Sequence, residues 1–238
     1  MSPDERCVLS FPGGNLDFVW SETTFKRLVK ADPEITAAWY DAKSNTLSIG
    51  TKDNGLYQFK TNGALQLADK FTSGSSKLPS NHVTIVFQDK TGRYWVGTAA
   101  GLMSGAPGKW KNDFANYEVR RVREFGTEIY VLADNELHKS AGGDKWITLD
   151  LDERMVEGEI RDFDVDKDGK IWMVSGVITQ YDPLSGAYKT FGGPENYTSL
   201  YGFRIAVDAD GAAWVGTEDK GLYVVDKADA LHIDVVLE

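Results

Sequence analysis

The chain has 238 residues, enough for one sizeable hydrophobic core, and its 26 Lys and Arg against 36 Asp and Glu give a net charge of −10. An acidic surface repels phosphate backbones, so nucleic acid is not an expected partner. No apolar run reaches the roughly 18 residues of a membrane span, and residues 1–30 lack the layout of a signal peptide. We therefore expect a soluble chain, either cytoplasmic or exported, and its single Cys7 excludes an internal disulfide.

The chain begins with a short unit that predicts three strands, at residues 8–11, 16–20 and 24–29, and that lacks a first strand of its own. Five further units follow, each with three strands joined by turns rich in Asp, Asn and Gly. Their inner three strands span residues 38–59, 85–103, 122–138, 163–181 and 204–225. Fourth strands are predicted at 65–67, 109–111, 146–149 and 188–191.

The units repeat at intervals typical of a solenoid or a propeller. The residues that end each second strand are Pro12, Gly50, Gly97, Leu132, Val174 and Gly216. Four-stranded units of this length are propeller blades, and we see no helix. The prediction is an all-β fold, a single β-propeller domain over 1–238 with six blades, five or seven being the alternatives.

The last predicted strand, at 231–237, has two candidate positions. It pairs either as the outer strand of the sixth blade or as the missing inner strand of the first. We favour the second position because it removes an exposed sheet edge.

The clearest unit runs from Asp208 to Tyr223 with the pattern Asp-x-Asp-Gly-x-x-Trp-Val-Gly-Thr-x-x-x-Gly-Leu-Tyr, and a shortened copy runs from Asp89 to Leu102. This pattern resembles the two-component-regulator propeller repeat. The resemblance implies a sensor domain, periplasmic in most members of that family and in some of them a sensor of oligosaccharides. The chain differs from that family in its six units and in having no kinase domain and no membrane span.

A second resemblance is to streptogramin-lyase-like propellers such as virginiamycin B lyase, and it rests on the residues from Asp168 to Trp172 and from Tyr181 to Gly186. It implies histidines and a glutamate that hold a metal in the channel. Because His82, His138 and His232 fall at unrelated positions of the repeat, we do not expect them to converge. We therefore expect no enzyme activity, with a metal-dependent lyase or hydrolase as the alternative.

Repeated residues of the units are interpreted first as structural. Trp95, Trp172 and Trp214 share one position and are predicted to fill the space between neighbouring sheets rather than to stack on sugars. In Gly97-Thr98 and Gly216-Thr217, the glycine is predicted to allow a close approach and the hydroxyl to satisfy a turn.

One acidic string, Asp164 to Gly169, matches the opening of a calcium loop, where Asp164, Asp166 and Asp168 would be the ligands. The twelfth position is Ser175 instead of an acid. Asp166 and Asp168 also coincide with the turn residues Asp208 and Asp210 of the clearest unit. Hairpin-turn formation is the favoured interpretation, and no cofactor is expected.

Binding residues are expected on the face where the connections between blades gather with the second-to-third-strand turns. The connections are 72–81, 112–118, the acidic 150–159, and 192–202. The candidate ligand-binding residues are Asp53, Asn54, Tyr117, Asp134, Asn135, Tyr197, Tyr201, Glu218 and Asp219. Acids, amides and aromatic rings suit a polyhydroxyl ligand, so the sequence predicts a non-catalytic recognition module for an oligosaccharide-like ligand or a partner protein. A pure protein-interaction scaffold is the remaining alternative.

Overall fold

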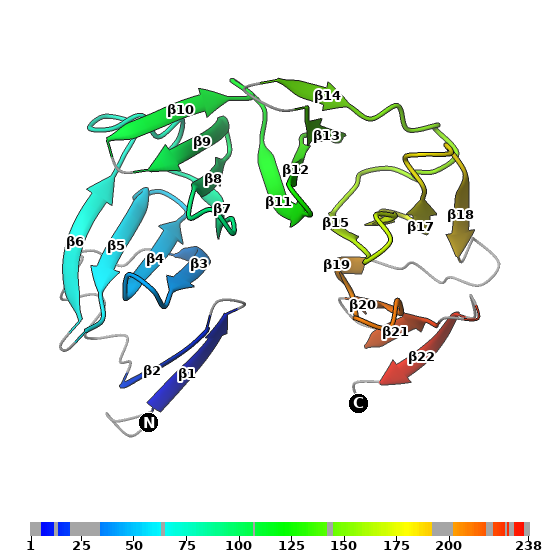
Figure 1. Cartoon of the computed structure of the whole chain (residues 1–238), viewed down its shortest axis with the longest axis horizontal. Helices are drawn as coiled ribbons and strands as arrows, with labels where there is room; N and C mark the ends of the chain where they lie inside the picture. Colours follow the sequence, from blue (N-terminus) through cyan, green and yellow to red (C-terminus); the bar gives the residue numbers. More distant parts are fainter. Residues whose placement is uncertain are drawn as a thin grey trace. The chain divides into compact units, whose positions relative to one another are not determined.

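The computed structural model describes residues 6–11, 14–19, 34–62, 65–106, 108–141, 145–191, 202–217, 221–226, 228 and 231–235. Every regular element within these ranges is a β-strand (Figure 1), as the sequence predicts. The described part of the chain holds no helix long and apolar enough to cross a membrane. The predicted strand at 24–29 lies outside the described residues.

Four-stranded antiparallel sheets account for most of the strands, and five such sheets, named blades I to V, follow one another along the described chain. Blade I contains β3 (Ile35–Asp41), β4 (Thr46–Thr51), β5 (Leu56–Lys60) and β6 (Gln66–Phe71). Blade II contains β7 (Val83–Gln88), β8 (Tyr94–Thr98), β9 (Gly101–Ala106) and β10 (Lys109–Asp113). Blade III contains β11 (Val119–Phe125), β12 (Glu128–Ala133), β13 (Glu136–Ser140) and β14 (Trp146–Thr148). Blade IV contains β15 (Asp162–Val165), β16 (Ile171–Val174), β17 (Ile178–Tyr181) and β18 (Tyr188–Phe191). Blade V contains β19 (Gly202–Val207), β20 (Ala213–Thr217), β21 (Leu222–Val225) and β22 (Leu231–Val235).

The two ends of the chain differ from the prediction in one respect. β1 (Arg6–Phe11) and β2 (Gly14–Val19) form the expected two-stranded hairpin. The last strand, however, does not complete that hairpin: β22 pairs with β21, with Val225 opposite Leu231. Our preference for its position was therefore wrong. The reason is that β21 is its neighbour along the chain, so pairing there closes a far shorter loop.

The chain divides into two compact units, Met1–Val122 and Arg123–Glu238, and the division falls within β11. Each unit is described separately below. The predictions of a single domain and of six blades stay predictions.

In the first unit, the core lies between blades I and II. Leu56 of blade I packs with Val83, Val86, Val96 and Met103 of blade II, and Leu78 from the connection between the blades joins them. Val83, Val96 and Met103 are fully buried. This is the sheet-on-sheet packing that the repeat predicts.

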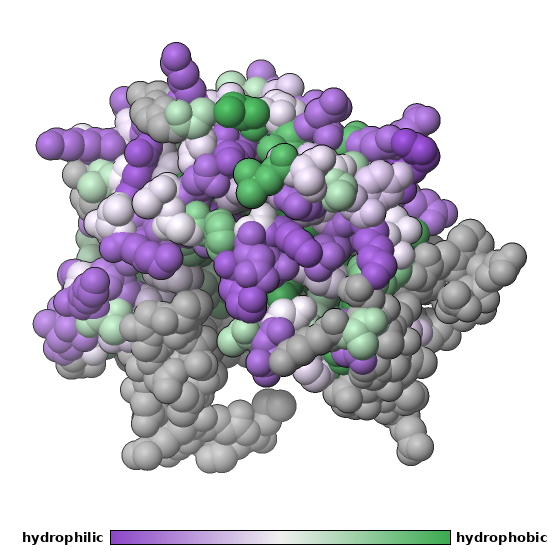
Figure 2. Space-filling model, turned by 45° about the vertical axis from the view of Figure 1, so that its right-hand side comes forward, coloured by the Kyte–Doolittle hydropathy of each residue, from purple (hydrophilic) through white to green (hydrophobic). Residues whose placement is uncertain are grey.

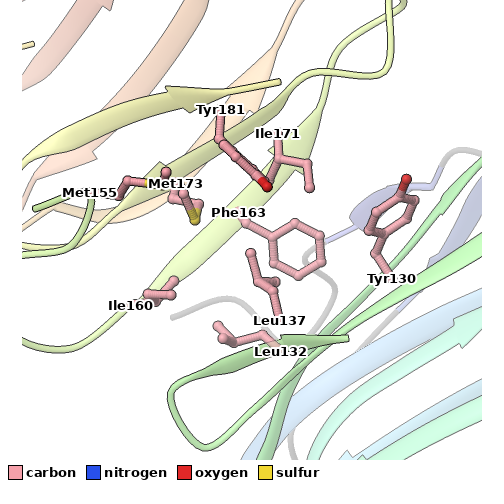
Figure 3. Close-up of a cluster of buried hydrophobic side chains, with 9 residues drawn as sticks. All are labelled: Tyr130, Leu132, Leu137, Met155, Ile160, Phe163, Ile171, Met173 and Tyr181. Carbon is pink, nitrogen blue, oxygen red and sulfur yellow. The ribbon is translucent and has the colours of Figure 1, made fainter. Parts of the chain in front are cut away.

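In the second unit, a larger cluster joins blades III and IV (Figure 3). Phe163 of β15 points toward Leu132 and Leu137 of blade III, and Ile171 and Met173 complete the cluster from β16. Blades IV and V meet around Trp172, which is 1 % exposed and stacks on Phe191. The predicted role of Trp172 in packing between sheets is thereby confirmed. Trp95 is also buried, and Trp214 is half-buried.

The first strand of each blade is a sheet edge, and its side chains reach the first strand of the next blade. Thr36 and Thr84 donate their hydroxyls to the carbonyls of Val83 and Val119. In the second unit, carboxylates replace the hydroxyls, and Oδ2 of Asp162 accepts the N–H of Ile205 at 3.3 Å. Backbone groups that an edge strand leaves unpaired are thus satisfied by side chains.

In two blades, the glycine that ends the second strand lies close to the first strand of the following blade. A Cβ on Gly97 would lie 2.7 Å from Ile85 Cγ2 and 2.8 Å from the carbonyl oxygen of Val119. A Cβ on Gly50 would lie 2.4 Å from Val83 Cγ1. At Gly216, nothing among the described residues lies within 4 Å, so the expected close approach is not found there. The threonine that follows bonds the turn in all three blades, through Thr51, Thr98 and Thr217.

Candidate ligand-binding face

Second-to-third-strand turns and the connections between blades meet within each unit, as the sequence predicts. In the first unit, the Gly55 N–H donates to the carbonyl of Asn81 at 3.0 Å, joining the β4–β5 turn to the β6–β7 connection. The Asn116 N–H donates likewise to Ala100 at 3.2 Å. In the second unit, the Gly176 N–H donates to Glu157 at 2.7 Å. Turns and connections therefore form a common surface, which we call the loop face.

The predicted ligand-binding residues occupy this face where the structure describes them. Asp53 and Asn54 share the β4–β5 turn, and Asp134 and Asn135 share the β12–β13 turn. Tyr117 lies in the β10–β11 connection with 38 % of its surface exposed. The remaining four, Tyr197, Tyr201, Glu218 and Asp219, lie outside the described residues.

Asn135 holds the β12–β13 turn against the acidic connection that follows β14. Its Oδ1 accepts the N–H of Ile160 at 2.7 Å, and its Nδ2 donates to the carbonyl of Gly158 at 3.3 Å. The backbone supports the same arrangement because Asp134, with φ of 49°, adopts the left-handed conformation that Asp and Asn tolerate in tight turns. Asn135 thus positions the loop face.

A cavity of about 390 Å³ opens beside this turn. It is lined by Asn135, Glu136, Thr148, Leu149, Asp150 and Leu151. Leu149 and Leu151 are partly buried against the core cluster of Figure 3, so they form an apolar floor. Glu136 and Asp150 are exposed and supply negative charge at the rim.

Beneath the rim lies His138, which is 6 % exposed. Its Nδ1 is 3.0 Å from the hydroxyl oxygen of Thr148, and its Nε2 is 3.5 Å from Oε2 of Glu136. Burial lowers the pKa of the His138 imidazole, and the Glu136 carboxylate opposes part of that shift. A neutral imidazole therefore supports two of the residues that line the cavity.

Sequence reasoning identified Asn135 and the acidic connection, but it missed the cavity residues at the end of β14 and directly after it. Thr148, Leu149 and Leu151 belong to an outer strand and its continuation, where the alternation of polar and apolar residues gives no sign of a cavity. A clue was available in Glu136 and His138, whose spacing on one strand places both side chains on one face.

The carboxylates of the calcium-like string serve separate contacts. Asp164 Oδ2 accepts the Val207 N–H at 2.9 Å, while Asp166 Oδ1 accepts the backbone N–H groups of Asp168 and Lys170. Asp168 is exposed and pairs with Lys167. For Asp166, the hairpin-turn interpretation is thereby confirmed. Among the described residues, no three His, Cys, Asp or Glu side chains converge so as to hold a metal ion.

Two of the histidines can be placed. His82 lies in the connection before β7, in the first unit, and His138 lies in β13, in the second. The side chain of His232, in β22, lies outside the described residues. The expectation that the three do not converge stays a prediction.

A family model described as "Two component regulator propeller" matches residues 77–100, which run from the β6–β7 connection to the start of β9. The predicted resemblance to the two-component regulator propeller repeat is confirmed. No match was found among the curated proteins.

Solved structures show that the fold is that of a β-propeller. The extracellular domain of a hybrid two-component system from B. thetaiotaomicron is 19% identical with a TM-score of 0.65, and the match covers 80% of this chain and 27% of that one. Virginiamycin B lyase from Staphylococcus aureus is 14% identical with a TM-score of 0.65, over 86% of this chain and 71% of that one. The WD40 β-propeller domain of Doa1 is 18% identical with a TM-score of 0.63, over 87% and 70%. The chain spans 27% of the length of the hybrid two-component system's extracellular domain and 31% of that of a one-component system from the same organism.

Proposed function

We propose that this propeller is a non-catalytic recognition module that binds a carbohydrate-like ligand at its loop face. The observation that carries the proposal is the cavity of about 390 Å³ beside the β12–β13 turn. Its size falls within the roughly 300–1,000 Å³ of typical small-molecule sites.

The chemistry of the cavity suits a polyhydroxyl compound. Leu149 and Leu151 offer an apolar surface to the C–H groups of a sugar ring, while Thr148, Asp150 and Glu136 offer hydrogen-bond partners at the rim. Because carboxylates only accept hydrogen bonds when ionised, a ligand rich in hydroxyl donors fits them. The two acids at the rim disfavour an anionic ligand and favour a neutral or cationic one.

The geometry also supports rigidity of the site. Asn135 fixes the turn through Ile160 and Gly158, and the floor is part of the core cluster. A site fixed before the ligand arrives loses less conformational entropy on binding.

Calorimetric titration with a panel of neutral and cationic oligosaccharides tests the proposal. We expect one or more to bind, and we expect Asp150→Ala and Glu136→Gln to weaken binding by about fivefold to tenfold each, as loss of a hydrogen bond to a charged group predicts. Asp168→Asn is the matched control because Asp168 is an exposed acid in a different turn.

The outcomes separate the alternatives. Absence of binding by the whole panel contradicts carbohydrate recognition, and capture of a protein from solution without added sugar favours an interaction scaffold. Binding that survives the cavity substitutions but is lost with Tyr197→Ala, Tyr201→Ala or Asp219→Asn places the ligand elsewhere on the loop face.

The proposal that the chain is non-catalytic has its own test. Metal analysis of the purified protein, together with an assay for turnover of quinupristin, the compound present in a solved virginiamycin B lyase structure, should show neither a stoichiometric ion nor turnover. A tightly bound ion accompanied by turnover supports the lyase alternative.

A further inference from the structure

Blade I has no tryptophan at the position that Trp95, Trp172 and Trp214 share in blades II, IV and V, and blade III has Tyr130 there. In blade II, Trp95 of β8 lies opposite Phe87 of β7. The same register in blade I places Ser48 of β4 opposite Trp39 of β3. Ser48 therefore occupies the position that Trp172 and Trp214 hold in blades IV and V.

The neighbouring blade compensates with a large residue at a second position. Where Trp172 of blade IV meets blade V, the residue before Trp214 is the small Ala213, and Trp172 and Ala213 belong to one cluster. Between blades I and II, the large and small residues change places. Blade I has the small Ser48 where blade IV has Trp172, and blade II has the large Tyr94 where blade V has Ala213. Burial raises the pKa of the Tyr94 phenol, and the Asp41 carboxylate of blade I adds to that shift. Tyr94 lines one cavity together with Asp41 and Ser44 of blade I, so its side chain is oriented toward that blade.

A cavity of about 260 Å³ lies between the outer strands of blade I and Tyr94 of blade II. It is lined by Asp41, Ser44, Thr46, Gln58, Lys60, Ala68, Asp69 and Tyr94. Gln58 is 4 % exposed and Tyr94 is 7 % exposed. These two residues form the inner wall, while Lys60 and Asp69 lie at the solvent edge.

The lining groups are held in place by one another. Gln58 Nε2 donates to Ser48 Oγ at 3.1 Å, and Lys60 Nζ donates to Thr46 Oγ1 at 2.8 Å and to the Ser44 carbonyl at 3.1 Å. Ser44 Oγ in turn donates to Asp41 Oδ2 at 2.6 Å. Small hydroxyl side chains thus line the cavity, while the indole on this face of blade I belongs to Trp39, which lies opposite Ser48 and packs on the blade II core.

We propose that this cavity is a second binding site, distinct from the loop face, for a small neutral polyhydroxyl ligand of about one sugar ring. It lies at the β3–β4 end of the blade, whereas the loop face begins at the β4–β5 turn, at the other end of β4. Its volume is below the roughly 300–1,000 Å³ of pockets for drug-sized ligands, which excludes an oligosaccharide and admits a monosaccharide.

The donors and acceptors match such a ligand. The Lys60 ammonium has three N–H donors, and two are used within the protein, so one is left for a ligand. Asp69 and Asp41 offer carboxylate oxygens on the same wall. A sugar hydroxyl both donates and accepts, so it can bond to a cation and a carboxylate at once, as neither an aliphatic nor an anionic ligand can.

Blade IV supplies an internal control. A smaller cavity of about 160 Å³ occupies the equivalent place, lined by Lys170, Gln180, Asp182, Ala187, Tyr188 and Lys189. Gln180 faces Trp172 across the strands just as Gln58 faces Ser48. The blade that keeps its tryptophan therefore has the same glutamine but less open space.

The test is titration of the whole chain with glucose, galactose and N-acetylglucosamine, followed by ligand-observed NMR. We expect millimolar binding of at least one sugar to the wild type. The double substitution Ser48→Trp with Tyr94→Ala recreates the large and small pair of blades IV and V, so it should fold and weaken binding at least about tenfold. Gln58→Ala should weaken binding about fivefold, and Gln180→Ala should leave it unchanged.

Each outcome decides the proposal. No binding by any of the three sugars overturns it, as does an equal loss in Gln58→Ala and Gln180→Ala. If the double variant fails to fold, as judged by circular dichroism, Gln58→Ala and Lys60→Ala carry the test. If Asp150→Ala, rather than Gln58→Ala, weakens monosaccharide binding, the sugar binds at the loop face and the proposed second site is overturned. Failure of the oligosaccharide panel to bind contradicts only the loop-face proposal and leaves the second site unaffected.

Discussion

Trp172 donates its indole N–H to Oδ2 of Asp166 at 3.1 Å, joining the second strand of blade IV to the turn that precedes it. The other oxygen of the same carboxylate accepts two backbone N–H groups of that turn. Trp95 with Asp89, and Trp214 with Asp208, repeat the bond at 2.9 Å each. One carboxylate therefore closes the hairpin and orients the indole that packs beside it.

Removal of the Asp166 carboxylate should destabilise the fold. Asp166→Ala leaves the Trp172 indole and two backbone N–H groups without their acceptor in a site that is 7 % exposed, so we expect a loss of about 3 kcal/mol. Trp172→Phe, which keeps most of the apolar contact, should cost about 1–2 kcal/mol. Urea denaturation measures both, with Asp168→Ala as the exposed control expected within about 0.5 kcal/mol of wild type. A neutral Asp166→Ala would contradict this role.

Gly97 and Gly216, which both end second strands, should differ in their tolerance of a methyl group. Gly97→Ala places a Cβ against a backbone carbonyl, which cannot move aside, and should cost about 2–3 kcal/mol as an overpacked core does. Gly216→Ala meets no described atom and should be neutral or slightly stabilising. Thermal unfolding of the two variants compares them directly, and equal melting temperatures would refute the close approach.

The buried Asp162 should contribute more to stability than the partly exposed Asp164. Asp162 is fully buried, accepts the Ile205 N–H, and lies 3.7 Å from Arg123. Asp162→Ala leaves the buried Ile205 N–H without its acceptor, while Arg123 keeps Asp164 as a partner at 3.5 Å, so we expect a loss of about 2–3 kcal/mol, whereas Asp164→Ala should cost about 1 kcal/mol. Chemical denaturation at low and high salt provides the measurement. A larger effect at Asp164 would reverse the assignment.

His138 should make the stability of the protein fall as the pH drops. Its pKa is lower in the folded state than the ordinary value of about 6.5. Above that value, both states are neutral and the contribution is complete. Below it, the unfolded chain takes up the proton first, so stability declines until the folded imidazole is protonated as well.

Melting temperatures between pH 7 and pH 5 test this decline. The wild type should lose more stability across that range than His138→Gln, which has no imidazole to titrate. Parallel curves, or an NMR titration that gives His138 an ordinary or raised pKa, would contradict it.

Most strands of the fold could be predicted from the sequence, because each blade encodes its own turns. Even the divergent unit at 122–138 forms strands β11 to β13 where its alternation predicts them. The alternation of β22 fits either sheet edge, and the short connection from β21, rather than the exposed edge of the first unit, decides its position. The open surroundings of Gly216 could not be predicted either, because the same Gly-Thr dipeptide lies against a neighbouring strand at Gly97.

The candidate sites were less accessible to prediction than the fold. Asn135 was identified, but as a ligand-binding residue rather than as the anchor of Ile160. The exchange of Ser48 and Tyr94 is present in the sequence, but its result depends on which strands face each other across two sheets. The face shown in Figure 2 is mostly hydrophilic, with apolar residues lying among polar and charged ones.

Because β22 completes its own sheet, every described four-stranded blade is built from one uninterrupted stretch of chain. A protease that cuts between blades would therefore leave the strand pairing within each sheet complete. Gene duplication or deletion of a single repeat would likewise add or remove a complete structural module. Changes in blade number during evolution can then occur without breaking any strand pairing inside the modules that remain.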